Sequence, residues 1–202
     1  MNLFQVKLKL AKFLGIVKDE VIPSMEAKRE VMEQYRVLYN PVCFIETGTY
    51  FGDTIEYFRP KFELLYSIEL AEDLHRRAQK RFESFKNVHI LQGDSGKLFN
   101  NLLPQLKGIN LFWLDGHYSS EFYVGEEYIK TARGESDTPI LQELTAIFKK
   151  TSGPQIILID DARLFTGKQD YPAIGRLKKF LDQFKRPYSF KVELDIIQIV
   201  TT

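Results

Sequence analysis

Five short apolar runs in this sequence each end at or next to an acidic side chain. Those side chains are Glu46, Glu69, Asp94, Asp115 and the adjacent pair Asp160 and Asp161. In an open parallel sheet the carboxyl ends of the strands meet at one edge, and ligands bind there. A single carboxylate at such a position is often a helix cap, but capping alone explains five in succession poorly. The pattern predicts a polar ligand site at one edge of a sheet.

The first acidic residue opens a turn that contains two glycines, Glu46-Thr47-Gly48-Thr49-Tyr50-Phe51-Gly52-Asp53-Thr54. Glycine lets the backbone adopt a positive φ and approach a ligand closely. The G-x-x-x-G spacing differs from the G-x-G-x-x-G of dinucleotide-binding enzymes, whose second glycine makes room for a pyrophosphate. We therefore expect a ligand that lacks a pyrophosphate. A strand–turn–helix without any ligand is the alternative.

S-adenosylmethionine (SAM) meets this requirement, because it has no phosphate and its sulfonium and amino group are positively charged. Glu46 can accept charge-assisted hydrogen bonds from the amino acid end of SAM, directly or through water. The other turn residues expected to contact SAM are Thr47, Gly48, Thr49, Gly52 and Thr54.

Two further segments fit the remaining parts of SAM. Glu69 lies 21 residues after Gly48, which is the usual interval for an acidic residue that accepts both hydrogens of a ribose diol. Asp94 can accept a hydrogen bond from the adenine amino group, and Ser95 can bond a ring nitrogen. Asp94 can equally be the N-cap of the following helix, so its residue type leaves both roles open.

Asp115, Asp160 and Asp161 follow the fourth and fifth predicted strands, which we expect to be neighbours. Carboxylates this close raise one another's pKa unless a cation joins them. Oxygen ligands suit Mg²⁺, Mn²⁺ or Ca²⁺, so we predict that these three aspartates bind a metal. Asp115 also lies where it can contact SAM, and His117 beside it can act as the base, so both are predicted to be catalytic. The alternative is that Asp160 or Asp161 caps a loop and Asp115 faces only SAM.

The sequence between these residues has the periodicity of alternating strands and helices. Strands are predicted at 42–45, 64–68, 88–91, 111–114, 156–159, 188–193 and 196–200, and helices at 52–58, 71–85, 97–106, from Thr138-Pro139 onward and at 174–184. Residues 115–137 are expected to be a polar loop. The alternation predicts parallel strands, and the short link Leu194-Asp195 requires an antiparallel last strand. The expected fold is an α/β, Rossmann-like, doubly wound, mostly parallel sheet with a C-terminal antiparallel hairpin strand.

Residues 1–40 precede this alternation and are predicted to form a helical segment that packs on the domain or covers it. Within that segment Ser24 is a plausible N-cap. The residues near helical spacing that follow it are Met25, Val31, Met32, Tyr35, Leu38 and Tyr39.

Composition narrows the class of protein further. The net charge of +1 gives no argument for a nucleic-acid partner. Cys43 is the sole cysteine, so an intrachain disulfide is excluded. No apolar run approaches the roughly 18 residues of a membrane span. We expect a cytoplasmic enzyme with a small-molecule partner, no nucleic acid and no transmembrane segment, while the sequence leaves a homo-oligomer open.

The run from Phe44 to Asp161 resembles the metal-dependent O-methyltransferases, and most closely the macrocin O-methyltransferase family of sugar-modifying enzymes. The family's E-T-G-x-x-x-G turn, its second-strand acid, the start of its D-G-D motif and its D-D pair are matched by Glu46, Thr47, Gly48, Gly52, Glu69, Asp115, Asp160 and Asp161. The resemblance implies a class I methyltransferase fold in which Asp115, Asp160 and Asp161 hold a divalent metal. The family's base is the second Asp of D-G-D, and His117 takes its place here.

The expected function is therefore SAM-dependent O-methylation of a small-molecule or sugar hydroxyl, assisted by a divalent metal and carried out by a domain spanning 41–202. Two other functions stay open. One is a SAM-binding protein of the same fold without transfer activity, and the other is a metal-dependent hydrolase on this scaffold that needs no SAM.

Overall fold

The structure is a computed structural model that describes residues 22–116, 121–124, 127–130 and 138–202, with side chains described outside 121–124 and 127–130. His117 and most of the N-terminal segment, residues 1–21, lie outside the described residues. No helix within the described ranges is long and apolar enough to cross a membrane.

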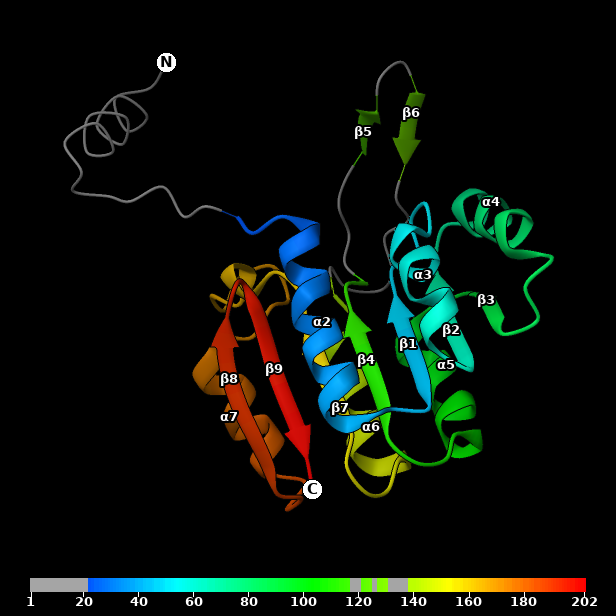
Figure 1. The fold of residues 1–202 in the computed structure, drawn as a ribbon. Helices are drawn as coiled ribbons and strands as arrows, with labels where there is room; N and C mark the ends of the chain where they lie inside the picture. The colour runs from blue at the N-terminus through cyan, green and yellow to red at the C-terminus, as the bar shows by residue number, and fades with distance from the viewer. Residues whose placement is uncertain (1–21, 117–120, 125–126, 131–137) are drawn as a thin grey trace, which may run out of the picture.

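A seven-stranded sheet forms the centre of the molecule (Figure 1). Its strands are β1 (Cys43–Thr47), β2 (Leu64–Glu69), β3 (Val88–Gln92), β4 (Asn110–Leu114), β7 (Ile156–Ile159), β8 (Tyr188–Glu193) and β9 (Ile196–Thr201), in the spatial order β3-β2-β1-β4-β7-β9-β8. The strands from β3 to β7 in this order pair in parallel, and β9 runs antiparallel to both β7 and β8. The predicted fold class is confirmed, including the reversal at the last strand.

The reversal depends on a two-residue turn between β8 and β9. Leu194 and Asp195 both have positive φ, at 52° and 60°, as a hairpin turn that matches the twist of its strands requires. Leucine is an uncommon residue in this conformation. Asp195 has a further role in the site described below.

A second, two-stranded sheet was not expected from the sequence. Residues 121–124 (β5) and 127–130 (β6) pair antiparallel within the stretch that we predicted as a polar loop. The apolar and aromatic residues Phe122, Tyr123, Tyr128 and Ile129 favour strand, and the polar residues around them hid this tendency. Figure 1 shows this hairpin beyond the edge at which β1 and β4 end.

In the described part of the chain, three helices pack on each face of the large sheet. Clusters of buried side chains place α2 (Met25–Tyr39), α3 (Asp53–Phe58) and α4 (Glu72–Phe82) on one face and α5 (Ser95–Leu102), α6 (Ile140–Lys150) and α7 (Ile174–Asp182) on the other. Short 3-10 turns span Arg59–Lys61, Leu103–Gln105 and Ala162–Leu164. Along β1, Cys43 and Ile45 face the second group of helices and Phe44 faces the first, which is the alternation expected of a strand covered on both sides.

Several helix boundaries differ from the prediction. Helix α4 ends at Phe82 rather than at residue 85, and α5 begins at Ser95 and ends at Leu102. Helix α6 begins at Ile140, so Pro139 is its cap rather than its first residue. The Thr138 hydroxyl nevertheless accepts a hydrogen bond of 3.3 Å from the Ile140 amide, so it satisfies one of the free amides of the first turn.

Helix α2 crosses one face of the sheet near β7 and β9 (Figure 1). The Ser24 side chain accepts from the Ala27 amide, as predicted for an N-cap. Val31 and Met32 are buried against the sheet, and the Tyr35 hydroxyl donates to the Gln198 side chain at 2.9 Å. Met25 and Leu38 fall near the same helical spacing but are exposed.

The two glycines of the first turn are required by neighbouring protein atoms. Gly48 has a φ of 84°, and an added Cβ would lie 2.5 Å from the carbonyl oxygen of Asp115. Gly52 has a φ of 80°, and its Cβ would lie 2.6 Å from the Phe82 ring. We expected the two glycines to let a ligand approach the backbone closely. They instead let this turn pack against the end of β4 and against α4.

We predict that Gly48→Ala destabilises the protein by about 1–3 kcal/mol more than Gly153→Ala does. Both glycines have positive φ, but nothing lies within 4 Å of the Cβ position of Gly153. The difference between the two variants in urea unfolding therefore isolates the clash with Asp115. Equal losses would contradict the close approach of the two turns.

Candidate active site at the carboxyl edge of the sheet

Hydrogen bonds beyond the strand ends bring the predicted acidic residues to one edge. The Asp115 amide donates to the Thr47 carbonyl at 3.1 Å, and the Asp160 amide donates to the Leu114 carbonyl at 3.0 Å. On the other side of β1, the Gly48 amide donates to the Ile68 carbonyl at 2.9 Å. The edge formed by β2, β1, β4 and β7 is therefore continuous, as the parallel arrangement predicts.

Glu46 lies at the end of a chain of buried hydroxyls. The Ser67 hydroxyl donates to Glu46 at 2.6 Å, and the Thr49 and Ser67 hydroxyls are 2.7 Å apart. A serine hydroxyl has one proton, so Thr49 donates to Ser67 and Ser67 to Glu46. Thr54 also hydrogen-bonds to Glu46. The structure thus brings together three of the residues predicted to bind the cofactor.

Burial raises the pKa of Glu46 to about 8, and the negative charges of Asp115 and Glu69 act in the same direction. The hydrogen bonds from Ser67 and Thr54 lower it only in part. A carboxyl group that is 2% exposed and surrounded by acidic groups is stabilised in its charged form by a positive ligand.

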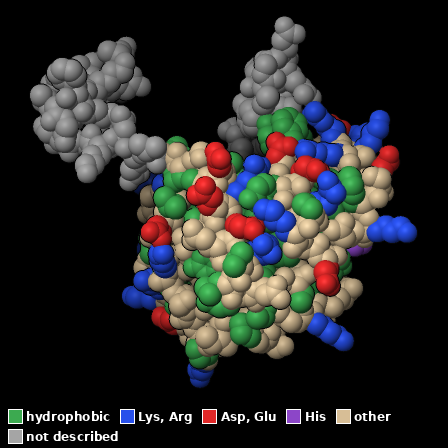
Figure 2. Space-filling view, in the orientation of Figure 1, with side chains coloured by type: hydrophobic (Ala, Val, Ile, Leu, Met, Phe, Trp, Pro, Cys, Tyr) green, Lys and Arg blue, Asp and Glu red, His purple; other side chains and the backbone are tan. Residues whose placement is uncertain are grey.

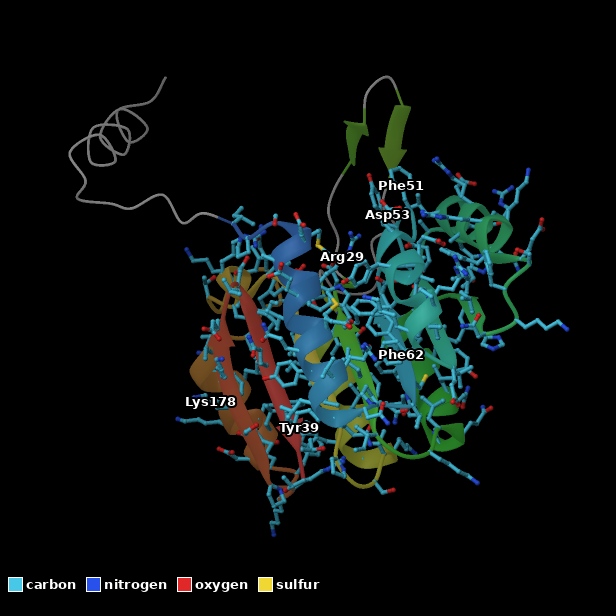
Figure 3. The ribbon with its side chains drawn as sticks, in the orientation of Figure 1. Arg29, Tyr39, Phe51, Asp53, Phe62 and Lys178 are labelled. Atoms are coloured by element: carbon cyan, nitrogen blue, oxygen red, sulfur yellow. The ribbon has the colours of Figure 1, made fainter. Side chains whose placement is uncertain are left out.

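Glu69 connects the end of β2 to the first turn. Its two carboxylate oxygens accept from the Tyr50 amide at 2.9 Å and from the Ala71 amide at 2.8 Å. The Leu70 amide also hydrogen-bonds to this carboxylate, so of its roughly four acceptor sites one is left for a ribose hydroxyl. On the outer side of the turn, Arg81 of α4 forms an ion pair of 2.7 Å with Asp53, and Figure 3 shows Phe51 and Asp53 beside the start of α3.

Asp94 occupies the N-cap position of α5, yet its side chain makes no capping hydrogen bond. One of its oxygens, Oδ1, is buried and has no hydrogen-bond partner among the described residues. Asp94 thus occupies the N-cap position that the alternative predicted, but its side chain does not cap the helix. A buried acceptor without a partner is costly, and an amino group from a ligand would satisfy it.

Ser95 makes a different contact from the one expected. Its hydroxyl donates to Glu143 of α6 at 2.6 Å, so its proton is already used within the protein. Glu143 is 1% exposed, and burial raises its pKa to about 7. Glu143, Asp115 and Asp160 line one small cavity with Gly116 and Thr138, so this helix residue belongs to the same edge.

Asp160 and Asp161 lie beside a buried lysine that the sequence analysis did not identify. The Lys28 ammonium is 2.5 Å from Oδ1 of Asp160 and 3.5 Å from Oδ1 of Asp161. Burial lowers the pKa of Lys28, but the hydrogen bond and charge of Asp160 and the charge of Asp161 outweigh this and raise it overall. Burial and the charges of Asp115 and Asp161 raise the pKa of Asp160 to about 7, against the effect of Lys28.

Among the residues described, Asp160, Asp161 and Asp195 form a group of three whose carboxylate oxygens lie within 4.8 Å of one another. We call these three residues the aspartate cluster. Asp195 joins it from the β8–β9 turn in place of the predicted Asp115. Arg163 forms ion pairs with both Asp161, at 2.7 Å, and Asp195. The cluster therefore already contains two cationic side chains.

Sequence reasoning missed three residues of this edge, and two of them carry a signal that could have revealed them. Lys28 and Val31 are three apart on the inner face of α2, and Glu143 and Ile140 are three apart on the inner face of α6. A charged residue at an inward helical position is rare unless it has a partner, so it could have been noticed. Asp195 lies in a turn, where aspartate is common, and its sequence position carries no such signal.

The two predicted ligands fit this edge unequally. A cationic ligand without phosphates suits Glu46, the remaining acceptor capacity of Glu69 and the buried Asp94 oxygen. A divalent metal bound to both Asp160 and Asp161 would require oxygens within about 2.6 Å, and the Lys28 ammonium already lies against these oxygens from the side of α2. In its described arrangement the cluster therefore does not fit an added metal. His117 lies outside the described residues, so its predicted role as base stays a prediction.

The surface over α2 and α3 carries both signs of charge. Figure 2 shows acidic and basic side chains interspersed on this face. Arg29, labelled in Figure 3, comes from α2 and lies with its guanidinium carbon 5.4 Å from the centre of the Tyr57 ring on α3. Arg29 thus bridges α2 and α3.

No protein-family model and no curated protein matches this sequence. Solved structures do match it. The O-methyltransferase TomG from Streptomyces achromogenes, solved with SAM, has a TM-score of 0.59 at 13% identity and covers 100% of this chain and 90% of that chain. An O-methyltransferase from Bacillus cereus, solved with S-adenosylhomocysteine (SAH), has a TM-score of 0.58 at 10% identity and covers 98% and 89%. The SAH-bound methyltransferase PaMTH1 from Podospora anserina has a TM-score of 0.51 at 14% identity and covers 84% and 74%.

The chain has a methyltransferase fold. At these identities the likeness establishes the fold and nothing finer. The methyltransferase fold accounts for the strand order and for the reversed β9.

The buried acids predict how stability depends on pH. Burial raises the pKa of Glu46 to about 8 and that of Glu143 to about 7, from 4.5 in an exposed chain. The folded protein therefore holds protons that the unfolded chain loses, so the free energy of unfolding should fall as pH rises from about 5 to about 8. Glu143→Gln should flatten this fall below about pH 7. Urea unfolding across this pH range tests it.

The exposed Glu63 provides a matched control, because Glu63→Gln removes an acid at the surface and should leave the slope unchanged. An unfolding free energy that rises steadily over this range, in the wild type and in Glu143→Gln alike, would contradict the assignment of raised pKa values.

Proposed function

We propose that this protein is a SAM-dependent methyltransferase that transfers a methyl group to the hydroxyl oxygen of a small molecule. The observation that carries the proposal is Glu46, a carboxyl group buried at the end of β1 beside two other acidic residues. Such a group is costly in its charged form without a cation. SAM has two cationic groups and no phosphate, so it provides what this position lacks.

The remaining contacts follow from the geometry of the edge. Glu46 accepts from the amino group of SAM, Glu69 accepts from the ribose diol with its remaining acceptor capacity, and the free oxygen of Asp94 accepts from the adenine amino group. Between these contacts lie three residues at the ends of β1 and β4, Thr47, Gly48 and Asp115, whose backbones are in contact. The methyltransferases TomG and PaMTH1 share the fold and were solved with SAM and SAH, which supports this choice of cofactor.

Methyl transfer itself requires no covalent bond between the protein and either reactant. The acceptor oxygen attacks the methyl carbon, the bond from that carbon to sulfur breaks, and SAH remains. Holding the two reactants in line contributes much of the acceleration, and the acceptor must lose its proton to a base. We assign that base to His117, which follows Asp115 and Gly116 at the end of β4.

The acceptor is expected to bind over the end of β4, because Asp115 and the aspartate cluster lie on that side of the cofactor residues. A sugar hydroxyl is the acceptor implied by the resemblance to the macrocin O-methyltransferase family. The same resemblance implies a divalent metal on Asp115, Asp160 and Asp161. Lys28 lies at Asp160 and Asp161 instead, so we assign no step to a metal.

We predict that SAM binds more tightly as pH rises from about 6 to about 7.5. Glu46 has a pKa of about 8, so binding a cation at lower pH must first remove its proton, which weakens binding by at most about tenfold per pH unit. Calorimetry should show proton release on binding in the wild type and none in Glu46→Gln. Glu63→Gln, at the surface, serves as the control.

A folded wild-type protein that binds neither SAM nor SAH would refute the proposed function. SAM binding with no methyl transfer to any member of a broad hydroxyl-acceptor panel would instead favour a SAM-binding protein of this fold without activity.

A further inference from the structure

The aspartate cluster is neutralised by cations of the chain itself. Lys28 contacts Asp160 and lies 3.5 Å from Asp161, and Arg163 pairs with Asp161 and Asp195. Three carboxylates and two cationic side chains leave one formal negative charge. Lys28 and Arg163 thus offset most of the negative charge that would attract a divalent ion to the cluster.

The position of Lys28 is built into the fold. It lies on the inner face of α2 beside Val31 and Met32, which are buried against the sheet, and it is itself only 4% exposed. A lysine is almost never buried without a partner, and here its partners come from residues 132 positions later in the chain. The packing of α2 therefore delivers the ammonium to the end of β7.

The distances place the ammonium where a metal would lie. Mg²⁺ lies about 2.0–2.1 Å and Ca²⁺ about 2.3–2.6 Å from carboxylate oxygens. An ion bound to the Oδ1 atoms of both Asp160 and Asp161 from the side of α2 would overlap the Lys28 nitrogen, which is 2.5 Å and 3.5 Å from them. One position at this edge can hold either cation but not both.

We propose that Lys28 is the resident cation of the aspartate cluster and holds the position that a divalent metal would otherwise take. The proposal goes beyond the methyltransferase assignment, because it concerns which cation serves this edge and does not depend on the methyl acceptor. It implies that the wild-type protein needs no divalent metal at this edge.

The test is Mn²⁺ titration followed by electron paramagnetic resonance on the full-length protein. The wild type should bind no Mn²⁺ at micromolar concentration. Lys28→Met keeps the length of the side chain and removes its charge, which leaves two negative charges in the cluster. It should therefore gain one Mn²⁺ site, with affinity about tenfold or more above the wild type. Adding Asp161→Asn to this variant should abolish the gain.

Two variants provide controls. Arg36→Met makes the same change of charge on the same helix, where Arg36 pairs with Glu33 rather than with the cluster, and it should gain no site. Lys28→Arg keeps a cation at the position and should also gain none.

A wild-type protein that binds one Mn²⁺ at micromolar concentration, and loses it in Asp161→Asn, would overturn the proposal. A folded Lys28→Met that gains no site would overturn it too, because Lys28 would then not be what excludes the metal. The wild-type titration decides the matter even if Lys28→Met does not fold. Calorimetry with SAH on the wild type is a separate measurement, so failure of the cofactor assignment would be recognised independently.

Discussion

The burial of carboxyl groups at the carboxyl edge of the sheet is the constraint on which the other features of the structure depend. Glu46, Glu69, Glu143, Asp160 and Asp161 are all less than a tenth exposed. A buried carboxylate must be protonated, hydrogen-bonded or paired with a cation. Parallel strands place all these groups on one side of the molecule, so the chain has to satisfy them at a single edge.

The protein uses two different solutions along this edge. Near β1 and β2 it supplies hydroxyls and backbone amides, as in the chain from Thr49 through Ser67 to Glu46. Near β7 it supplies full positive charges from Lys28 and Arg163. Among the residues described, no cationic side chain pairs with Glu46, so this half keeps an affinity for a positive ligand, whereas the other half already has Lys28 and Arg163. This asymmetry gives the two halves different expected roles, one binding SAM and the other holding its own structure in place.

Much of the fold could be predicted from the sequence, because strands buried on both faces appear as short apolar runs and their spacing restricts the topology. The two-residue link at Leu194-Asp195 was sufficient to predict the antiparallel last strand, which the structure confirms. Helix ends were less accurate, since the last turn of α4 depends on local packing rather than on periodicity. The β5–β6 hairpin was missed because it has few strand-forming residues and polar residues surround them. The strand-end carboxylates could be predicted, because their positions follow directly from those of the strands.

The contacts that connect distant parts of the chain could not be predicted in this way. Lys28 and Asp160 are 132 residues apart. A charged residue on a helix is predicted to face solvent unless its partner is known. The same holds for Glu143 on α6. Each of these residues interrupts the apolar face of its helix, and each lies directly against the edge from one side of the sheet. The interruption itself is therefore informative: an inward charge on a helix that covers a parallel sheet indicates an opposite charge or a hydroxyl at the nearest strand end.

This arrangement couples the packing of α2 to the electrostatics of the site. Burial of the apolar surface of Val31 and Met32 stabilises the fold. Lys28 on the same face loses its hydration, and its ion pairs with Asp160 and Asp161 compensate for that loss. Displacing the helix would leave the buried Asp160 carboxylate without its cation, at a cost larger than that of the lost apolar contacts alone. The acidic edge thus holds helix α2 in place through Lys28. The arrangement of Asp160 and Asp161 depends in turn on this helix, which precedes the whole sheet in the sequence.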